Sequence, residues 1–533
     1  MQPQSSPSAV QVRDYALLAL LASLVGAAAL VFYYRQNAIL LYGDAVAHIN
    51  IARRVFDSRT PGLFQLGTVW LPLPHVLDLP FVANNWLWQG GVGAAIPSLI
   101  AYVAGVLGVL RLAGGMASRT AAWIAAAIFA LNPNLIYMQS TAMTEPLYLA
   151  LFVWTAVFFA EFARVAKDDP GQGRRALEKC AIMVSAAMLV RYDGWFLAAV
   201  VAVAAFAAVW KIRLTAWPVR RGLIKFLLLT GATAGVWLAY NHAAYANALE
   251  FANGPYSAHA IQERTRTATM PTYPGEKSAR VAVQYFLKTV RLNMGQKRAE
   301  YLMLPAAFVA LLAMIYFDRR FWTWALLWVP VPFYVVMMAW GSVPIYLPEW
   351  WPFSYYNVRY GLQLLPAVAV FVALGCEFLC KFVSPRLVAG AAAAIVAISY
   401  ASAWQSTPVC LREAQANGQV RMDFDRLLAA ELKKLPPSAT IMMDCGAHPG
   451  AVQLAGIPFR RVLRESNPPY WEVALSQPAL SADYLVALQG DDVARAVRLF
   501  PQGLEEVAAV STPGGQKAVI YYSSTRSRKP GIE

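Results

Sequence analysis

Long apolar runs recur along the first 405 residues of the chain and are separated by short polar turns. A helix of about 20 apolar residues crosses a bilayer core of about 30 Å, so runs near this length predict transmembrane helices. The pattern therefore predicts an α-helical polytopic membrane protein with about eleven transmembrane helices. The eleven runs cover roughly 14–34, 92–110, 120–137, 146–163, 180–190, 195–210, 222–244, 301–317, 321–341, 358–380 and 387–404.

The apolar range 180–210 is too long for one membrane span. A single helix here would be about 46 Å long at 1.5 Å per residue, and it would bury Arg191 and Asp193 in the middle of the membrane. We therefore predict two short helices that meet at the sequence RYDG, residues 191–194. The segment 132–145 also interrupts an apolar stretch, with Pro133 and Glu145. Broken helices in membrane proteins line wet cavities, so both breaks mark candidate sites.

Basic residues occupy alternate turns between the spans. With eleven spans, the basic turns at 111–119, 164–179, 211–225, 319–320 and 381–386 fall on one side, together with Arg13. The positive-inside rule makes that side the cytoplasm, with the C-terminus outside. Two long loops, at about 35–91 and 245–300, then lie outside. In the first we expect helices in the membrane interface, with Trp70, Trp86 and Trp88 at headgroup depth.

The composition changes to that of a soluble domain after about residue 405. RMDFDRLLAAELKKL and DDVARAVRLF have helical patterns, and TIMMD, RRVLR, DYLVAL and KAVIYYSS have strand patterns. We predict a transmembrane domain at 1–405 and a small extracytoplasmic α/β domain at 406–533. The second domain has no G-x-G-x-x-G motif, so we predict no nucleotide site there.

Composition and charge exclude a soluble globule and disfavour nucleic acid as a partner. The chain is 58% hydrophobic and 14% charged, whereas soluble domains are about a quarter charged. The net charge of +15 is spread over loops between apolar runs. Positive-inside topology and contact with anionic membrane lipids explain this charge, so we predict lipid contact and no nucleic-acid partner. The five cysteines show no metal-type spacing.

The first outer loop contains the sequence GDAVAHINIARR, residues 43–54. On a helix, Asp44 and His48 lie on one face at i, i+4. A carboxylate beside low-dielectric surroundings suits a general base, because desolvation raises its pKa. Asp44 is therefore a candidate catalytic residue and His48 a candidate binding residue. Two alternatives stay open: Asp44 caps the helix, or Asp44 and His48 bind a metal with a third ligand that the sequence does not identify.

Two further groups of polar residues adjoin apolar spans. Glu145 opens the span that starts at 146, and a carboxylate this close to a membrane core is costly and usually functional. Glu145 is thus the second catalytic candidate. The neighbouring candidates for substrate binding are Arg191, Tyr192 and Asp193. For Arg191 and Asp193, the alternative is that they merely pair with each other.

Arg359 and Tyr360 open the tenth span from its outer side. The Arg359 guanidinium either extends to lipid headgroups or binds a phosphate, to which its planar set of donors is suited. Both residues are candidates for substrate binding. His75, in LPLPHVLDLP, is a weaker candidate, because a lone histidine in such a loop is more often structural.

These motifs, in this order, resemble the GT-C superfamily of membrane glycosyltransferases. The motifs are YGDAVAHINIARR, STAMTEPLYL, RYDGW and NVRYGLQLLP, and the similarity spans roughly residues 30–400. The chain is most similar to the branch that holds the protein O-mannosyltransferases and the aminoarabinose transferases. A variable outer C-terminal domain is also typical of such proteins.

The resemblance implies a glycosyltransferase that moves a hexose or pentose from a polyprenyl-phosphate donor. The acceptor would be a hydroxyl of a protein, lipid or glycan at the outer face of a bacterial or archaeal cytoplasmic (inner) membrane. Asp44 would deprotonate this hydroxyl, and Arg359 and Arg191 would meet the phosphate. Family members often carry two adjacent acids in the first loop; here Ala45 follows Asp44, which leaves Glu145 as its partner. Metal dependence varies in the superfamily, so no ion is carried over and a divalent cation stays open.

A transporter or flippase for lipid-linked sugars is the alternative function. It would account for the spans, the broken helices and the charges near the membrane core. It also predicts internal repeats, and the two halves of the sequence show none that is convincing.

Overall fold

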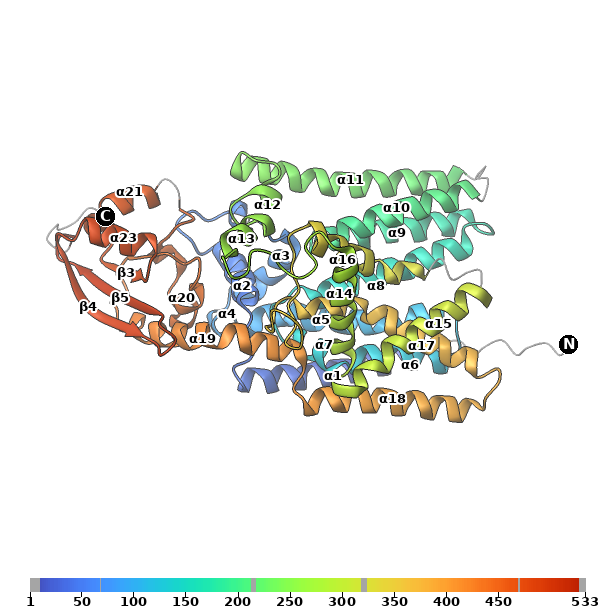
Figure 1. Ribbon diagram of the computed structural model, residues 1–533. Coiled ribbons are helices and arrows are strands. Elements are labelled where there is room, and N and C mark those ends of the chain that lie inside the picture. Colours follow the sequence, from blue (N-terminus) through green and yellow to red (C-terminus); the bar gives the residue numbers. More distant parts are fainter. Residues whose placement is uncertain (1–9, 68, 212–216, 318–323, 468–469, 527–533) are drawn as a thin grey trace. The chain divides into compact units, whose positions relative to one another are not determined.

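The computed structural model describes residues 10–67, 69–211, 217–317, 324–467 and 470–526 (Figure 1). Contacts divide the chain into two compact units. The first consists of Met1–Arg35, Thr68–Pro74 and Ala95–Glu413, and the second of Gln36–Gly67, His75–Ala94 and Ala414–Glu533. Most of the first outer loop thus belongs to the same unit as the C-terminal segment. The boundary at 405/406 between a membrane domain and an outer domain stays a prediction.

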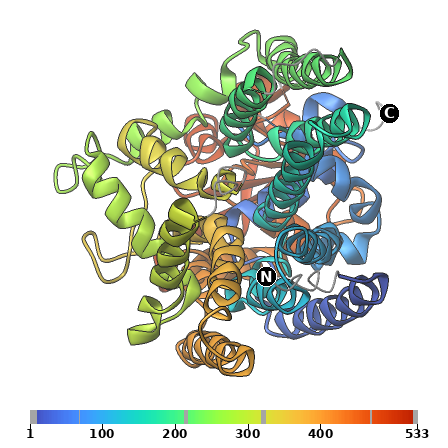
Figure 2. The same ribbon diagram turned by 90° about the vertical axis from the view of Figure 1, so that its right-hand side faces the viewer.

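The first unit is helical. Its helices before the second long loop are α1 (Val12–Arg35), α5 (Val92–Gly114), α6 (Arg119–Ala130), α7 (Pro133–Met138), α8 (Glu145–Val165), α9 (Pro170–Met188), α10 (Asp193–Lys211) and α11 (Trp217–Tyr245). Those that follow are α12 (Glu250–Asn253), α13 (Ala258–Thr265), α14 (Ala279–Met294), η2 (Lys297–Tyr301), α15 (Met303–Phe317), η4 (Ala325–Trp328), α16 (Pro330–Trp340), η5 (Val358–Leu364), α17 (Leu365–Leu379) and α18 (Pro385–Gln405). Figure 2 shows many of these helices end on.

Eight helical segments among the described residues are long and apolar enough to cross a membrane. They confirm a polytopic, mostly helical membrane protein. The predicted run 120–137 divides into two short helices, α6 and α7, because Asn132 and Pro133 end one helix and start the next. The start of the run 321–341 lies outside the described residues. The count of eleven spans stays a prediction.

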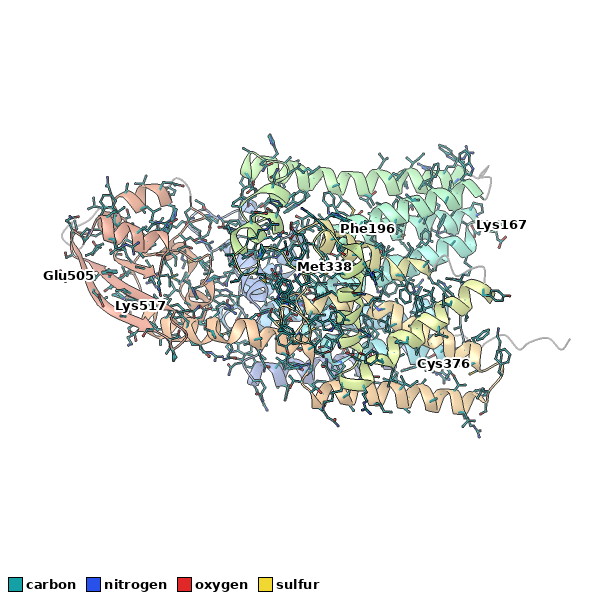
Figure 3. The ribbon with its side chains drawn as sticks, viewed as in Figure 1. Lys167, Phe196, Met338, Cys376, Glu505 and Lys517 are labelled. Carbon is teal, nitrogen blue, oxygen red and sulfur yellow. The ribbon has the colours of Figure 1, made fainter. Side chains whose placement is uncertain are left out.

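The predicted break at RYDG is confirmed. Helix α9 ends at Met188, α10 begins at Asp193, and the four residues between them form a turn. The two helices pack beside α8 and α11, and Figure 3 marks the α8–α9 turn at Lys167. Since α9 and α10 have 19 residues each, each helix is about 28 Å long at 1.5 Å per residue.

The second unit contains α2 (Gly43–Arg54), η1 (Leu63–Gln65), most of α3 (Pro72–Val82) and α4 (Asn85–Gln89). From the C-terminal segment it adds most of α19 (Val409–Leu432), α20 (Pro449–Ala455), η6 (Phe459–Arg461), α21 (Tyr470–Ser476), α22 (Pro478–Ser481) and α23 (Asp492–Leu499). Its strands are β1 (Ile441–Met443), β2 (Val462–Leu463), β3 (Tyr484–Leu488), β4 (Leu504–Ser511) and β5 (Lys517–Ser523).

These strands form one mixed sheet in the order β2-β1-β3-β5-β4. The first three pair in parallel, and β5 pairs antiparallel with β3 and β4. The four predicted strands are all present. Strand β4 was not predicted: its side chains are mostly exposed, so LEEVAAVS lacks the apolar alternation of a half-buried strand. Glu505 and Lys517 mark β4 and β5 in Figure 3.

A ring of hydrogen bonds holds α2 inside the second unit. Asn50 Nδ2 donates to Gln453 Oε1 at 2.8 Å, Gln453 Nε2 donates to the Trp88 carbonyl at 2.7 Å, and Trp88 Nε1 donates to Asn50 Oδ1 at 2.8 Å. All three side chains are buried. The expected headgroup position of Trp88 is therefore wrong, because this indole packs inside the protein, whereas Trp86 is exposed.

Candidate functional site

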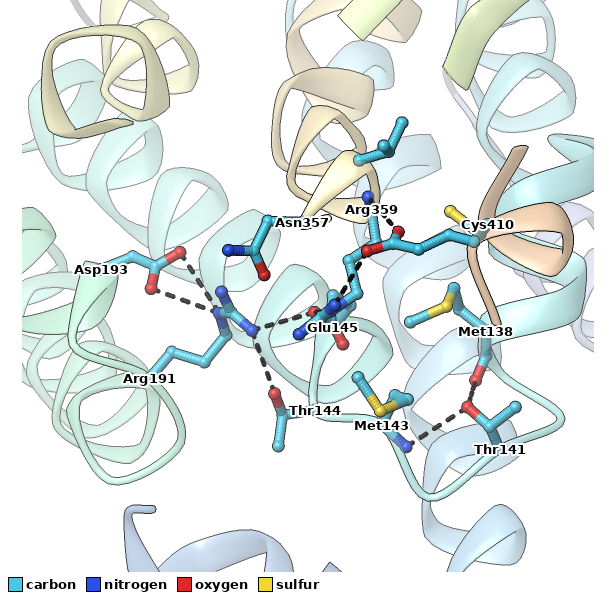
Figure 4. A network of polar contacts seen from close by, with 12 residues as sticks. Met138, Thr141, Met143, Thr144, Glu145, Arg191, Asp193, Asn357, Arg359 and Cys410 are labelled. Carbon is cyan, nitrogen blue, oxygen red and sulfur yellow. Dashed lines mark hydrogen bonds and ion pairs between the residues drawn. The ribbon is translucent and has the colours of Figure 1, made fainter. Parts of the chain in front are cut away.

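Glu145 lies at the start of α8, at the break that the sequence predicted. The following Pro146 fits the first turn of a helix, where its missing N–H costs nothing and a carboxylate is favoured by the helix dipole. The Glu145 side chain is fully buried, and its Oε1 accepts hydrogen bonds from two arginines (Figure 4). The donors are Arg191 Nη1 at 3.0 Å and Arg359 Nε at 3.1 Å. One carboxylate oxygen thus joins two guanidinium groups.

Arg191, in the turn between α9 and α10, uses all of its nitrogens in this cluster. Besides Glu145, Nη1 donates to Thr144 Oγ1 at 3.2 Å, Nε to Asp193 Oδ1 at 3.2 Å, and Nη2 to the Tyr334 hydroxyl at 3.1 Å. The Tyr334 hydroxyl in turn donates to Asp193 Oδ2 at 2.5 Å. Arg191 and Asp193 do pair, as the alternative interpretation held, but the pair is part of a larger network.

Arg359 lies on η5, which directly precedes α17. Its Nη1 donates to Glu413 Oε1 at 3.2 Å, and its backbone N–H donates to Glu413 Oε2 at 3.1 Å. Glu413 is fully buried near the start of α19. Both guanidinium groups also lie over the ring of Tyr360, at 5.1 Å for Arg191 and 5.2 Å for Arg359. The ring adds a favourable electrostatic contact for both cations.

A shell of buried amides fixes the elements that carry these charges. Asn293, on α14, donates from Nδ2 to the Val358 carbonyl at 2.8 Å, directly before Arg359. Asn134, on α7, accepts the Cys410 N–H at 2.9 Å, which holds the first turn of α19. Because α7, α14, η5 and α19 are tied to one another, the charged side chains are held by hydrogen bonds rather than by loose loops.

Several acids surround the two arginines. Among the described residues, Arg191 and Arg359 form ion pairs with three carboxylates, those of Glu145, Asp193 and Glu413. Glu145 Oε2 is buried and has no hydrogen-bond partner among the described residues. Such a buried polar atom is rare and calls for an explanation such as a ligand.

Tyr192 is separate from this cluster. Its hydroxyl donates to the Val69 carbonyl at 2.9 Å and accepts from Trp237 Nε1 at 3.3 Å, and its ring stacks on Phe251. These contacts support the turn that carries Arg191 and give Tyr192 a structural position. Its predicted role in substrate binding stays a prediction.

Asp44 lies in the second unit, in the first turn of α2. The N-cap residue of this helix is Tyr42, so Asp44 lies two residues beyond the cap and does not occupy the cap position. Its side chain is partly exposed. A carboxylate in the first turn of a helix interacts favourably with the helix dipole.

His48 and His75, two of the predicted binding residues, contact each other in the second unit. His48 Nδ1 and His75 Nε2 are 2.8 Å apart, and His75 Nδ1 lies 3.0 Å from the Leu66 carbonyl. A carbonyl only accepts, so we assign the His75 proton to Nδ1 and the shared proton to His48. Burial, with the nearby His48, holds the pKa of His75 well below its usual range. His75 is therefore a neutral acceptor that orients His48.

For metal binding by Asp44 and His48, the described residues give no cluster with a third ligand. Within the described ranges, no three His, Cys, Asp or Glu side chains come together in a way that would hold a metal ion. The divalent cation that the resemblance left open stays untested.

Glu413 and Tyr334 belong to the cluster but were missed by sequence reasoning. Glu413 stands in CLREAQ, beyond the last apolar run, and was assigned to the soluble segment. Tyr334 lies within an apolar span, where a single tyrosine is unremarkable. The isolated hydroxyl in PVPFYVVMM was the one available signal, since a buried tyrosine hydroxyl needs a partner.

No protein-family model and no curated protein matches the sequence. The fold, however, is similar to solved structures. A crystal structure of ArnT from Cupriavidus metallidurans in the apo state matches with a TM-score of 0.58 and 12% identity, covering 96% of this chain and 98% of that chain. The structure of the same protein bound to undecaprenyl phosphate matches with a TM-score of 0.57 and 13% identity, covering 93% and 97%.

An oligosaccharyltransferase from Archaeoglobus fulgidus in the apo form matches with a TM-score of 0.49 and 12% identity, covering 97% of this chain and 75% of that chain. The match to ArnT extends over nearly the whole chain. It confirms the predicted resemblance at the level of the fold, which is similar to that of ArnT.

Proposed function

We propose that this protein is a membrane glycosyltransferase that transfers a sugar from a polyprenyl-phosphate-linked donor to an acceptor hydroxyl at the outer face of the membrane. The observation that carries the proposal is the pair of guanidinium groups joined by Glu145 Oε1 in a fold similar to ArnT, a protein whose structure was solved with undecaprenyl phosphate. Guanidinium groups bind phosphate oxygens in a bidentate manner, which a point charge does not do.

The two arginines are oriented before any substrate binds. Asp193 and Glu413 each hold one guanidinium, while Glu145 contacts both. In this proposal the donor phosphate takes the position that Glu145 Oε1 has between Arg191 and Arg359, and the other two acids keep the arginines in place. Preorganised cations of this kind stabilise the charge that develops on a leaving phosphate.

The reaction is a single displacement at the anomeric carbon. The acceptor oxygen forms a bond to this carbon, the bond from carbon to phosphate oxygen breaks, and the polyprenyl phosphate leaves with the electron pair. The proton of the acceptor hydroxyl passes to Asp44, as the resemblance implies. A donor phosphate adds negative charge beside the three acids of the arginine cluster. We therefore propose that a divalent cation offsets part of this charge, and a chelator tests this.

The lipid chain of such a donor has an apolar groove available in the first unit. A groove of about 450 Å³ lies between α6–α7 and α18. Small or apolar side chains line almost all of it, including Ile124, Leu131, Ile136, Ala389, Ala393 and Val396. Hydrocarbon chains bind such surfaces without leaving polar groups unpaired.

We further propose that the active face, the C-terminus and the two long loops point out of a bacterial or archaeal cytoplasmic membrane, with eleven spans. The basic turns support this orientation, because 164–179 and 381–386 connect helices at the ends opposite to RYDG and to η5. Accessibility of introduced cysteines at residues 168 and 505 to a membrane-impermeant reagent tests it. Labelling of residue 505 alone in intact cells is the expected result.

Transfer in a reconstituted system tests the proposed function. The full chain in liposomes receives a radiolabelled polyprenyl-phosphate sugar and mixed protein, lipid and glycan acceptors, with and without EDTA. Asp44→Asn should lower transfer by about 10²- to 10⁴-fold, the contribution typical of a general base. Asp168→Asn, at an exposed position in the α8–α9 turn, is the control and should transfer normally.

The result separates the two candidate functions. Transfer that survives Asp44→Asn unchanged would remove Asp44 from the mechanism. Movement of the labelled lipid across the bilayer, without transfer to any acceptor, would instead support a flippase.

A further inference from the structure

A small polar cavity lies beside the end of α16, apart from the arginine cluster. Its volume is about 290 Å³, near the lower end for small-molecule sites. It is formed by α13, by the turn that precedes α14 and by residues 339–342. The side chains that matter for its chemistry are Gln262, Tyr273, Glu276, Lys277 and Trp340.

Among the described residues, one carboxylate oxygen of Glu276 is hydrogen-bonded and the other has no hydrogen-bond partner. Arg266 Nη2 donates to Glu276 Oε1 at 2.7 Å, which sets the orientation of the carboxylate. Glu276 Oε2 is buried and has no hydrogen-bond partner among the residues that the structure describes. An acceptor is therefore held at the cavity with nothing donating to it.

Gln262, on α13, supplies the complementary group. Its side chain is about nine-tenths buried, at 8% exposure, and its Nε2 also lacks a partner in the described part of the chain. Among the described residues, two that line this small cavity thus carry a buried amide donor and a buried carboxylate acceptor without a partner. Buried polar atoms are nearly always paired, and two in one cavity indicate a ligand that satisfies both.

A hydroxyl group fits both needs, because it donates one hydrogen bond and accepts others. A fully ionised phosphate would satisfy the amide and meet Arg266 and Lys277, but it has no hydrogen to donate to Glu276. An ammonium would satisfy Glu276 but not the amide. The exposed indole of Trp340 and the buried ring of Tyr273 add apolar faces to the same cavity. A ring with several hydroxyls and apolar C–H faces, which is a carbohydrate, matches this lining.

The cavity is connected to the arginine cluster through a single helix. Tyr334, which contacts Arg191 and Asp193, and Trp340, which lines the cavity, are six residues apart on α16. Six residues of helix span about 9 Å along the axis. That separation is of the order of one or two sugar rings.

We propose that this cavity binds a sugar unit of the acceptor, and that the acceptor is therefore a glycan or a glycolipid. The identification of this sugar as part of the acceptor rests on the proposed function. The binding of a carbohydrate in this cavity rests on the cavity alone. Gln262 and Glu276 contact hydroxyls of the sugar, and Trp340 covers one face of its ring.

Direct binding tests the inference without any transfer reaction. The purified full chain in detergent is titrated with methyl glycosides of neutral hexoses, N-acetylhexosamines and hexuronic acids, each followed by saturation-transfer NMR, and with inorganic phosphate as a separate probe. We expect at least one glycoside class to bind. Gln262→Leu and Glu276→Gln should each weaken its binding by about tenfold. Ile261→Ala, at the neighbouring exposed position of α13 outside the cavity lining, should not.

The outcomes distinguish this inference from the proposed function. Absence of glycoside binding, binding of phosphate alone, or binding that Gln262→Leu and Glu276→Gln leave unchanged would overturn it; the thermal midpoint of each variant shows that it is folded. Glycoside binding by a protein that transfers no sugar would overturn the proposed function and leave the cavity assignment in place. Sugar transfer with an acceptor KM that Gln262→Leu and Glu276→Gln leave unchanged would support the proposed function and overturn the cavity assignment.

Discussion

Arg359 and Glu413 contact each other twice, once through a side chain and once through the backbone. The guanidinium donates to Glu413 Oε1 at 3.2 Å, and the Arg359 N–H donates to Oε2 at 3.1 Å. The pair is buried and joins η5 to the first turns of α19. The chain between the last apolar run and the C-terminal segment is thus fixed to the arginine cluster by a carboxylate.

Replacing Arg359 should destabilise the first unit strongly. Arg359→Met leaves Glu145 and Glu413 buried with one cationic partner fewer, and breaking a buried ion pair in this way costs about 3–5 kcal/mol. Thermal denaturation in detergent measures the loss in the free energy of unfolding. In the double variant Arg359→Met/Glu413→Gln, the two losses should not add, with a coupling of about 1–3 kcal/mol. Strict additivity would show that the pair does not act as one unit.

Gly361 allows η5 to lie directly against α14. A Cβ at this position would approach the Thr289 carbonyl oxygen to 2.5 Å, and this atom belongs to helix backbone that cannot move away easily. Gly361→Ala should therefore shift η5, and with it Arg359, at a cost of about 1–3 kcal/mol. Thermal stability and transfer activity should fall together.

Gly390→Ala is the matched control for Gly361. A Cβ on Gly390, within α18, meets no atom within 4 Å. Alanine is the better helix former, so this change should be neutral or stabilise the protein by up to about 1 kcal/mol. Equal effects of the two substitutions would contradict the close approach of η5 and α14.

The apolar pattern predicted most helices, because burial and membrane insertion both act on local composition. The break at RYDG was predicted from the cost of a mid-membrane Arg191, and the structure has a turn there. Long-range partners were not predictable in the same way. His48 and His75 are 27 residues apart, and nothing in either local sequence specifies a contact between them.

The arginine cluster was predicted in part. Glu145 was predicted because a carboxylate beside an apolar span is costly. The other predicted residues are polar groups at the ends of apolar spans: Arg191, Asp193, Arg359 and Tyr360. The structure brings all five together. Glu413 was not selected, because a charged residue in a polar segment has no such cost in the sequence. Its burial depends on the tertiary packing of α19, which a local pattern does not encode.

The His48–His75 pair should make the second unit sensitive to acid. The pKa of His75 is well below 6.5 in the folded protein, so the unfolded chain binds a proton near pH 6.5 that the folded protein does not bind at His75. Stability from this group is thus present above pH 6.5 and is lost as the pH falls below it. From pH 7.5 to pH 5.5 the expected loss is about 1.4 kcal/mol.

A histidine substitution tests this pH dependence. Thermal midpoints are compared at pH 7.5 and 5.5 for the wild type and for His75→Gln, which does not titrate. The acid-induced decrease should be smaller in His75→Gln, whereas His242→Gln, at an exposed position on α11, should behave as the wild type does. An unchanged pH dependence in His75→Gln would refute the assignment.

Lys288 is a buried lysine in an ion pair, and Lys225 is a lysine at the surface in a similar pair. Lys288 Nζ, on α14, lies 2.8 Å from both oxygens of Glu300, and both residues are about 3% exposed. Lys225 and Glu178 have a similar distance, 2.7 Å, but their side chains are 48% and 26% exposed. Lys288 also contacts the exposed Glu349, and Glu178 also contacts Arg174, so the two pairs each have a further partner and differ mainly in burial.

Lys288→Met should cost about 3–5 kcal/mol, because Glu300 would remain buried with one partner fewer. Lys225→Met should cost at most about 1 kcal/mol, since water replaces the lost contact. Thermal unfolding in detergent measures both, and Lys288→Met/Glu300→Gln should recover part of the loss by removing the buried charge. If both single variants lost the same stability, or if the second substitution recovered nothing, the buried ion pair would not be the source of the effect.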